Sequence, residues 1–223
     1  MFRKSKKEKN TYGIIGLGRF GYALAMELAM AGADLIVLDN NEEKVRELRE
    51  YTDSAFVVKN LDKKTLSETG IQNCDIAVVG IGGQMDTSIL TTLNLVTLGV
   101  PHVIAKAASA EHGEILEKLG AEIVYPERDI ALRLAHRLEA SRVLDYIQLS
   151  ETLNISKLLV PESIKGKSVQ EADLRGKFGA NIIAIENGKS VIESIRPDYI
   201  FKPGDILFVS GNKDGLNRLS ELE

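Results

Sequence analysis

The sequence has few of the residues that build disulfide-stabilised or metal-binding proteins. It contains one cysteine, Cys74, and three histidines among 223 residues. A single cysteine excludes an intrachain disulfide and suits a reducing cytosol. One cysteine and three scattered histidines also fail to give the ligand spacing of a zinc site. Cys74 begins the apolar run CDIAVVGI, so we expect a small residue packed beside a strand rather than a reactive thiol.

Long hydrophobic runs and an excess of positive charge are also absent. No stretch approaches the ~20 apolar residues that cross a bilayer, and MFRKSKKEKN at residues 1–10 lacks the apolar core of a signal peptide. Any position at a membrane then requires a second chain. The net charge of −4 does not support binding to a nucleic acid polymer. The basic residues of this segment favour a solvated, disordered tail, with contact to anionic lipid as the alternative.

From Tyr12 onward, apolar strand-like runs alternate with amphipathic segments. The expected strands are Tyr12–Ile15, Leu35–Leu38, Ala55–Val58, Ile76–Val79, Val103–Ala105 and Glu122–Val124. The expected helices are Phe20–Ala31, Glu42–Tyr51, Lys63–Thr69, Thr87–Leu98 and Ala110–Leu119. Glycines follow four of these helices, where the chain needs a left-handed residue: Gly32, Gly70, Gly99 and Gly120. This alternation predicts an α/β fold, a Rossmann-like doubly wound parallel sheet.

A helix and a smaller unit follow. Pro126–Ser141 predicts a helix that begins on proline and carries one apolar stripe. Two interpretations of this stripe stay open, packing on the chain's own sheet and contact with another subunit. After Tyr146, short strand-like runs and turns such as ENGK and KPGD predict a small α+β unit. Its expected helices are Val169–Lys177 and Lys213–Leu222.

The string GLGRFG at residues 16–21 has the spacing of a phosphate-binding loop. Gly16 allows the tight turn out of the first strand, Gly18 lets a phosphate approach the backbone, and Gly21 lets the helix pack closely. The helix N-terminus adds free N–H groups and a positive dipole. Because the loop follows a strand and begins a helix, it predicts a nucleotide site.

Asp39 and Arg19 refine this prediction. Asp39 ends the second strand, 18 residues after Gly21, close to the ~20 expected of an acid that binds ribose. Asn40 and Glu43 have the spacing of a capping box, which leaves Asp39 for ribose and disfavours NADP; a helix cap at Asp39 is the alternative. Arg19 within the loop indicates a polyphosphate tail, hence ATP or ADP, and a surface ion pair is the alternative.

Groups for enzymatic chemistry are missing. No tyrosine is followed by a lysine four residues later, and the histidines fit structural positions. Two GKS strings lack the upstream glycine of a Walker motif, because Pro161 and Ile183 stand there. The sequence predicts a ligand-binding protein and not an enzyme. An NAD(H)-binding redox sensor or a small NAD-dependent oxidoreductase is the alternative.

Five strings together resemble a known family: YGIIGLGRFGYALAMEL, VLDNNEEKV, VIAKA, LGAEIVYPERDIALRLA and VQEADLRGKFGANIIAIENGK. The chain resembles the RCK proteins, regulatory subunits of Ktr/Trk-type bacterial potassium uptake systems. The resemblance implies a basic tail at 1–11, a Rossmann-like nucleotide-binding N-lobe at 12–125, a crossover and dimerisation helix at 126–147 and a C-lobe at 148–223. It also implies homodimers that assemble into an octameric ring, peripheral on the cytoplasmic face of the plasma membrane beneath a membrane-embedded potassium transporter subunit.

The resemblance implies ligands and site residues as well. Members bind ATP or ADP in the N-lobe, some bind NAD(H), and the ring gates potassium flux. The implied nucleotide-binding set is Gly16, Gly18, Arg19, Phe20, Gly21, Asp39, Asn40, Lys106 and Glu127. Glu127 is expected to reach the neighbouring subunit's nucleotide, with Mg²⁺ or Ca²⁺ as its metal; a first-turn helix charge is the alternative.

Cyclic di-AMP is the second implied ligand. Arg175, Asn181 and the backbone of Ile182 match the positions that hold it at a C-lobe dimer interface. An arginine suits a phosphate and an amide suits an adenine edge. The alternative is structural, with Arg175 closing a helix and Asn181 beginning a strand.

Overall fold

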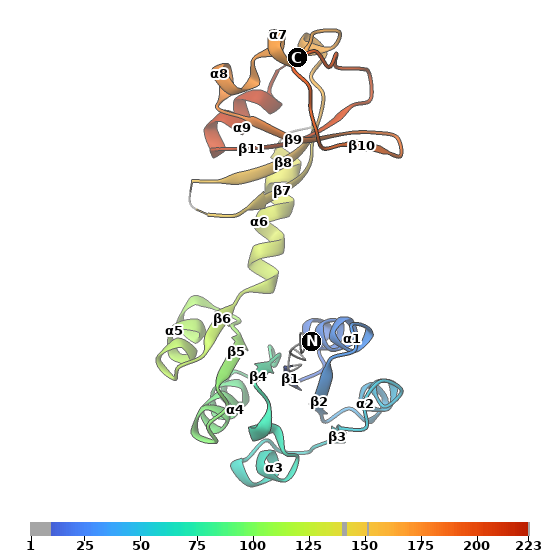
Figure 1. Cartoon of the computed structure of the whole chain (residues 1–223). Helices are drawn as coiled ribbons and strands as arrows, with labels where there is room; N and C mark the ends of the chain where they lie inside the picture. The colour runs from blue at the N-terminus through green and yellow to red at the C-terminus, as the bar shows by residue number, and fades with distance from the viewer. Residues whose placement is uncertain (1–9, 140–141, 151, 223) are drawn as a thin grey trace, which may run out of the picture. The chain divides into compact units, whose positions relative to one another are not determined.

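The computed structural model describes residues 10–139, 142–150 and 152–222 (Figure 1). The tail was expected at residues 1–11; its residues 1–9 lie outside the described residues, and Thr11 begins the first strand. The chain divides into two compact units, Met1–Pro126 and Glu127–Glu223, and each is described by itself. Within the described ranges, no helix combines the length and apolar character needed to cross a bilayer.

The first unit is built on a six-stranded parallel sheet of order β3-β2-β1-β4-β5-β6. The strands are β1 (Thr11–Ile15), β2 (Asp34–Asp39), β3 (Ala55–Val57), β4 (Ile76–Val79), β5 (His102–Lys106) and β6 (Glu122–Val124). This order confirms the Rossmann-like fold. The chain adds β2 and β3 on one side of β1, and then adds β4, β5 and β6 on the other side. Because the strand order reverses between β1 and β4, the carboxyl ends of these two strands border a crevice.

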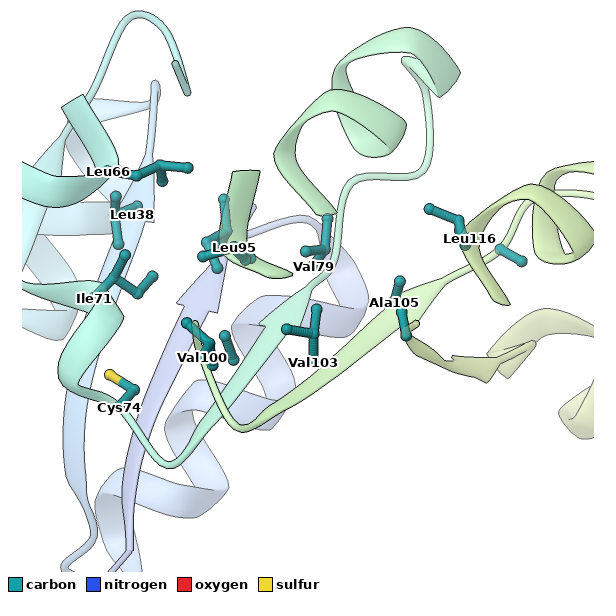
Figure 2. Packing of buried hydrophobic residues seen from close by; sticks show 14 residues of the cluster. Leu38, Leu66, Ile71, Cys74, Val79, Leu95, Val100, Val103, Ala105 and Leu116 are labelled. Atoms are coloured by element: carbon teal, nitrogen blue, oxygen red, sulfur yellow. The ribbon is translucent and has the colours of Figure 1, made fainter. Parts of the chain in front are cut away.

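Helices cover both faces of this sheet. They are α1 (Arg19–Met30), α2 (Glu42–Leu48), α3 (Lys63–Glu68), α4 (Met85–Thr97) and α5 (Ala110–Lys118), with a 3₁₀ turn η1 (Ile71–Asn73). Neighbouring strand residues point to opposite faces. Ile14 and Val37 therefore pack with α1 and α2. Leu38 and Val79 pack on the other side with α3, α4 and α5, where Figure 2 shows Leu95 and Leu116.

Local signals in the first unit agree with the sequence. The glycines expected to end helices all have positive φ: Gly32, Gly70, Gly99 and Gly120. Cys74 is buried against the sheet (Figure 2), and burial raises the pKa of its thiol to about 11. The structure thus confirms a packing position for Cys74, since a protonated, buried thiol is inert.

The second unit contains a five-stranded antiparallel sheet of order β10-β9-β11-β8-β7. Its elements are α6 (Pro126–Glu139, which starts one residue before the unit), β7 (Val143–Gln148), β8 (Asn154–Leu159), η2 (Glu162–Ile164), α7 (Val169–Ala172), α8 (Leu174–Phe178), β9 (Asn181–Asn187), β10 (Ser190–Ile192), β11 (Ile206–Gly211) and α9 (Lys213–Ser220). Strand β7 was not expected from the sequence. It adds to the edge of the sheet beside β8.

Helix α6 leaves its apolar stripe exposed. Ile130, Leu134 and Leu138 expose 61%, 41% and 73% of their surface. On a different side of the helix, Arg133 forms a bidentate ion pair with Asp145 of β7, with 2.7 Å between Nε and Oδ1. Within the second unit, the stripe therefore does not pack on the unit's own sheet.

The single helix expected at Val169–Lys177 is wrong, because the structure has two short helices there. The break is at Asp173, a non-glycine residue with φ of 46°. Its carboxylate accepts a hydrogen bond from the N–H of Gly176 at 3.0 Å. A Cβ at Gly176 would clash with this carboxylate, so the glycine makes the cap possible.

A buried carboxylate organises the other end of the second unit. Asp205 is fully buried and accepts hydrogen bonds from Asn187 Nδ2 at 2.6 Å, the Tyr199 hydroxyl at 2.9 Å and the Lys202 N–H at 2.8 Å. These bonds tie the end of β9 and the loop after β10 to the start of β11. Burial and the bond to Asp205 raise the pKa of Tyr199 to about 12, so the phenol stays a donor at neutral pH.

We expect Asp205→Ala to lower the free energy of unfolding of the second unit by about 2–4 kcal/mol, because three donors lose their acceptor in a buried place. Urea denaturation followed by circular dichroism measures this. Asp198→Ala is the matched control, since Asp198 is exposed and forms an ion pair with Arg196 at the surface; its effect should stay within about 0.5 kcal/mol. Equal effects of the two substitutions would contradict the assigned role.

Candidate functional site

The glycine loop at residues 16–21 is shaped by close backbone packing. Gly16 has φ of 89°, and its N–H donates to the carbonyl of Leu38 at 2.8 Å. A Cβ on Gly21 would overlap the carbonyl oxygen of Gly16, and one on Gly80, after β4, would lie 2.8 Å from the same oxygen. The loop is therefore pressed between α1 and the end of β4.

Gly18 differs from these glycines. It is the N-cap of α1 with ordinary extended backbone angles, and no side chain caps the helix there. The nearest atom to a Cβ on Gly18 would be 3.9 Å away. The protein's own packing thus has room for a side chain at Gly18, and this space lies at a helix N-terminus that attracts anions.

Asp39 connects the glycine loop to the turn after β2. One carboxylate oxygen accepts a hydrogen bond from the N–H of Leu17, and the other accepts from the N–H of Asn41 at 2.8 Å. The sequence left Asp39 for ribose and did not predict that its carboxylate would also bind these two backbone N–H groups. Each oxygen still has a second acceptor position, so the carboxylate remains able to accept from a ligand hydroxyl while it holds the loop.

The spacing predicted Asn40 as the capping residue of α2, and this prediction is wrong, because the capping residue is Asn41. The side chain of Asn41 accepts from the N–H of Lys44 at 3.1 Å. The reason is that Asp39 takes the N–H of Asn41, which turns the chain and starts the helix one residue later. Asn40 consequently lies between the strand and the cap, where it lines the cavity described next.

A cavity of about 700 Å³ opens at the carboxyl ends of β1, β2, β3 and β4. It is lined by Gly16 and Gly18, residues 38–41 with Lys44, residues 58–62, residues 80–84, and Thr87, Leu90, Thr91 and Asn94 of α4. Apolar side chains and a few placed polar groups are typical of a small-molecule site. Glycines 80, 82 and 83 were not singled out from the sequence. The reversal of strand order brings their loop beside Gly16.

Other predicted residues lie at the rim or outside the lining. Arg19 is exposed in the first turn of α1, and it is not part of the lining, nor are Phe20, Gly21 and Lys106. Lys106 borders the cavity, because a Cβ on Gly82 would be 3.2 Å from its Nζ. Glu127 belongs to the second unit, so its relation to the cavity stays a prediction.

Residues predicted for a second ligand lie on one short stretch of the second unit. Arg175 is exposed in α8, Asn181 is exposed at the first position of β9, and Ile182 is half-buried beside the core. Gly179 in a left-handed conformation turns the chain between them. In the described part of the chain, no three His, Cys, Asp or Glu side chains gather as metal ligands.

Comparisons with known proteins identify two domains. A TrkA-N domain matches residues 12–126 and a TrkA-C domain matches residues 157–223. The chain is 36% identical to the Ktr system potassium uptake protein C of Bacillus subtilis (strain 168), over 96% of this chain and 97% of that protein. Protein A of the same system is 35% identical, over 93% and 94%. The solved GsuK channel shares the fold, with a TM-score of 0.67 at 21% identity, over 98% of this chain and 40% of the channel chain.

The two loop glycines give a contrasting prediction. Gly21→Ala should lower the free energy of unfolding of the first unit by about 3 kcal/mol, because its Cβ overlaps the Gly16 carbonyl. Gly18→Ala should change it by less than about 1 kcal/mol, since the space is open. Urea denaturation of both variants measures the difference. Similar losses in both would show that the loop is packed differently from this structure.

Proposed function

The chain belongs to the family of TrkA-N and TrkA-C domain proteins that includes the Ktr potassium uptake proteins, and on this premise we propose that it is a nucleotide-sensing subunit that gates a membrane potassium transporter. Membership confirms the resemblance found in the sequence. The proposal concerns the ligand, the gating and the assembly of this particular chain. It gives the chain no catalytic role.

The extent of the cavity is the observation that carries the proposal. Its lining residues come from the segments at the ends of β1 to β4, from α2 and from α4, and within the described residues none comes from β5 or β6. In a Rossmann sheet the first half holds the adenosine and the phosphates, and the second half holds the nicotinamide. Among the described residues, the lining spans the first half and the adjacent segment of β4 and α4 and does not reach β5 or β6, and this extent supports ATP or ADP. An NAD(H)-binding redox sensor is the second candidate.

The residues suit an adenosine polyphosphate. Gly18 and the start of α1 receive the phosphates, and Asp39 accepts from the ribose hydroxyls while it holds the loop. Arg19, exposed one residue after Gly18, reaches the terminal phosphate when the nucleotide binds. Lys106 at the rim adds a second cation. Glu127 comes from a neighbouring subunit, and Mg²⁺ or Ca²⁺ bound with the nucleotide joins it to the phosphates.

Gating then follows from differential binding. ATP and ADP differ by one phosphate, so the assembly state with the better contacts to that phosphate is favoured by ATP. The exposed stripe of α6 supports a homodimer, and four dimers make the octameric ring of the proposal. The ring lies on the cytoplasmic face of the plasma membrane, bound to the potassium transporter subunit.

Cyclic di-AMP is the second ligand of the proposal. The exposed guanidinium of Arg175 and the exposed amide of Asn181 are close in sequence across one turn. In the second unit, the guanidinium provides hydrogen-bond donors for a phosphate and the amide provides a partner for the edge of a base. Their exposure leaves them available to a ligand shared by two C-lobes.

The first test is the melting temperature of the purified chain with ATP, ADP, NAD⁺, NADH and cyclic di-AMP, each with and without Mg²⁺. ATP and ADP should raise it by mass action. Arg19→Ala should lower the affinity for ATP by about tenfold and the affinity for ADP by less, because one charge-assisted contact to a phosphate is lost. Arg49→Ala, an exposed arginine at the end of α2, should have no effect. The cyclic di-AMP shift should disappear in Arg175→Ala only.

Two outcomes would contradict these assignments. Equal ATP and ADP affinities in wild type and in Arg19→Ala would remove Arg19 from phosphate recognition. A shift with NADH and with neither ATP nor ADP would favour the redox-sensor alternative.

The second test is rubidium flux through a Ktr-type membrane subunit reconstituted in vesicles with the chain. Replacing ADP by ATP should change the flux severalfold. Gly18→Ala should remove this dependence, because its methyl group occupies the phosphate space. The same flux with and without the chain, under either nucleotide, would contradict a gating role.

A further inference from the structure

We propose that Asn94 of α4 determines which base the cavity accepts, by presenting its side-chain oxygen to the 6-amino group of adenine. The proposal rests on the proposed function, in which an adenosine nucleotide occupies this cavity. It adds a specificity-determining residue on an element that the sequence motifs do not include.

The position of the base follows from the order of the cavity's parts. Phosphates lie at Gly18, where the helix N-terminus is, and the ribose lies at Asp39, where β2 ends. The base therefore lies beyond Asp39, toward the segment after β3 and the facing side of α4. Val58, Leu61 and Leu90 line this end of the cavity and provide apolar walls for the faces of a purine.

Asn94 lines this end of the cavity, and a hydrogen bond determines which way its amide group faces. Its Nδ2 donates to the carbonyl oxygen of Leu61 at 3.0 Å, across 33 residues of sequence. A carbonyl only accepts, so the nitrogen must face Leu61 and the oxygen must lie on the other side of the amide group. Among the described residues, the hydrogen bond from Nδ2 to Leu61 is the one bond of the Asn94 side chain, and Oδ1 has no protein donor. This oxygen is an acceptor without a protein donor, in a residue that lines the cavity.

Other polar side chains of the segment after β3 are held by Thr65 or have the wrong polarity, whereas, in the described part of the chain, Asn94 Oδ1 is not held by a protein donor. Asn60 Oδ1 accepts from the Thr65 hydroxyl at 2.7 Å, and Asp62 accepts from the Thr65 N–H at 2.8 Å to cap α3. Lys59 only donates. An acceptor favours adenine, whose 6-position donates, over guanine, whose 6-oxygen also accepts.

A second group on α4 supports a ligand at this wall. The hydroxyl of Thr91, three residues before Asn94, is buried and has no hydrogen-bond partner within the described structure. Thr91 also lines the cavity. Buried polar atoms are generally paired. Among the residues described, Ser88 and Thr92 of the same helix are also unpaired but lie outside the lining, so Thr91 is the hydroxyl of this group that a ligand in the cavity can reach.

The test compares ADP, GDP and ribose 5-phosphate by calorimetric titration of the full chain, with competition against ADP for the weak sugar phosphate. Wild type should prefer ADP to GDP by about tenfold. Asn94→Leu should lower the affinity for ADP by about tenfold and bring the affinities for ADP and GDP within about twofold of each other. The affinity for ribose 5-phosphate should not change. Thr97→Val is the matched control, because the Thr97 hydroxyl bonds to its own helix at Leu93 and lies outside the lining.

Asn94→Asp separates base reading from a structural role. Aspartate keeps an acceptor for the 6-amino group and loses the donor to Leu61, so the preference for ADP should persist. The inference would be overturned if Asn94→Leu lowered the affinities for ribose 5-phosphate and ADP equally, or if that variant kept the preference for ADP over GDP. Wild type that binds neither nucleotide would overturn the proposed function, and the inference with it.

Discussion

The carboxylate of Asp39 is the contact on which the geometry of the first unit's site depends. It takes the N–H of Leu17 from the glycine loop and the N–H of Asn41 from the turn after β2. Two loops that begin different helices are thus held by one side chain. Because both oxygens keep a free acceptor position, this anchor also remains a ligand group. In the proposed function, Asp39 therefore couples holding the loop to binding the ribose.

The shape of the cavity follows from this anchor and from close backbone approaches. Gly21 and Gly80 let α1 and the end of β4 press on the Gly16 carbonyl, which opens the loop at Gly18 only. The bond from Asn94 to Leu61 connects α4 to the segment after β3 and defines the far wall. The result is a pocket whose lining, among the described residues, ends at β4 and α4, and the proposed mononucleotide matches this extent.

The second unit uses carboxylates in the same way, to hold chain segments that have little regular structure. Asp205 gathers three donors from two segments, the end of β9 and the loop after β10, and Asp173 makes a left-handed break that joins two short helices. Arg175 follows directly after this break. The proposed second-messenger residues are therefore positioned by a local cap, whereas the N-lobe site is positioned by a whole sheet.

The sequence alone determined the doubly wound sheet, the glycine loop, the helix-ending glycines and the family, because periodicity and short-range spacing encode local backbone geometry. It did not predict strand β7, the break at Asp173, the cap at Asn41 or the burial of Asp205, since each depends on a hydrogen bond or strand pairing that forms only in the folded chain. Only the tertiary structure brought Gly80 to Gly16 and Asn94 to Leu61. Residues far apart in sequence become neighbours through strand order, and spacing along the chain carries no record of that order.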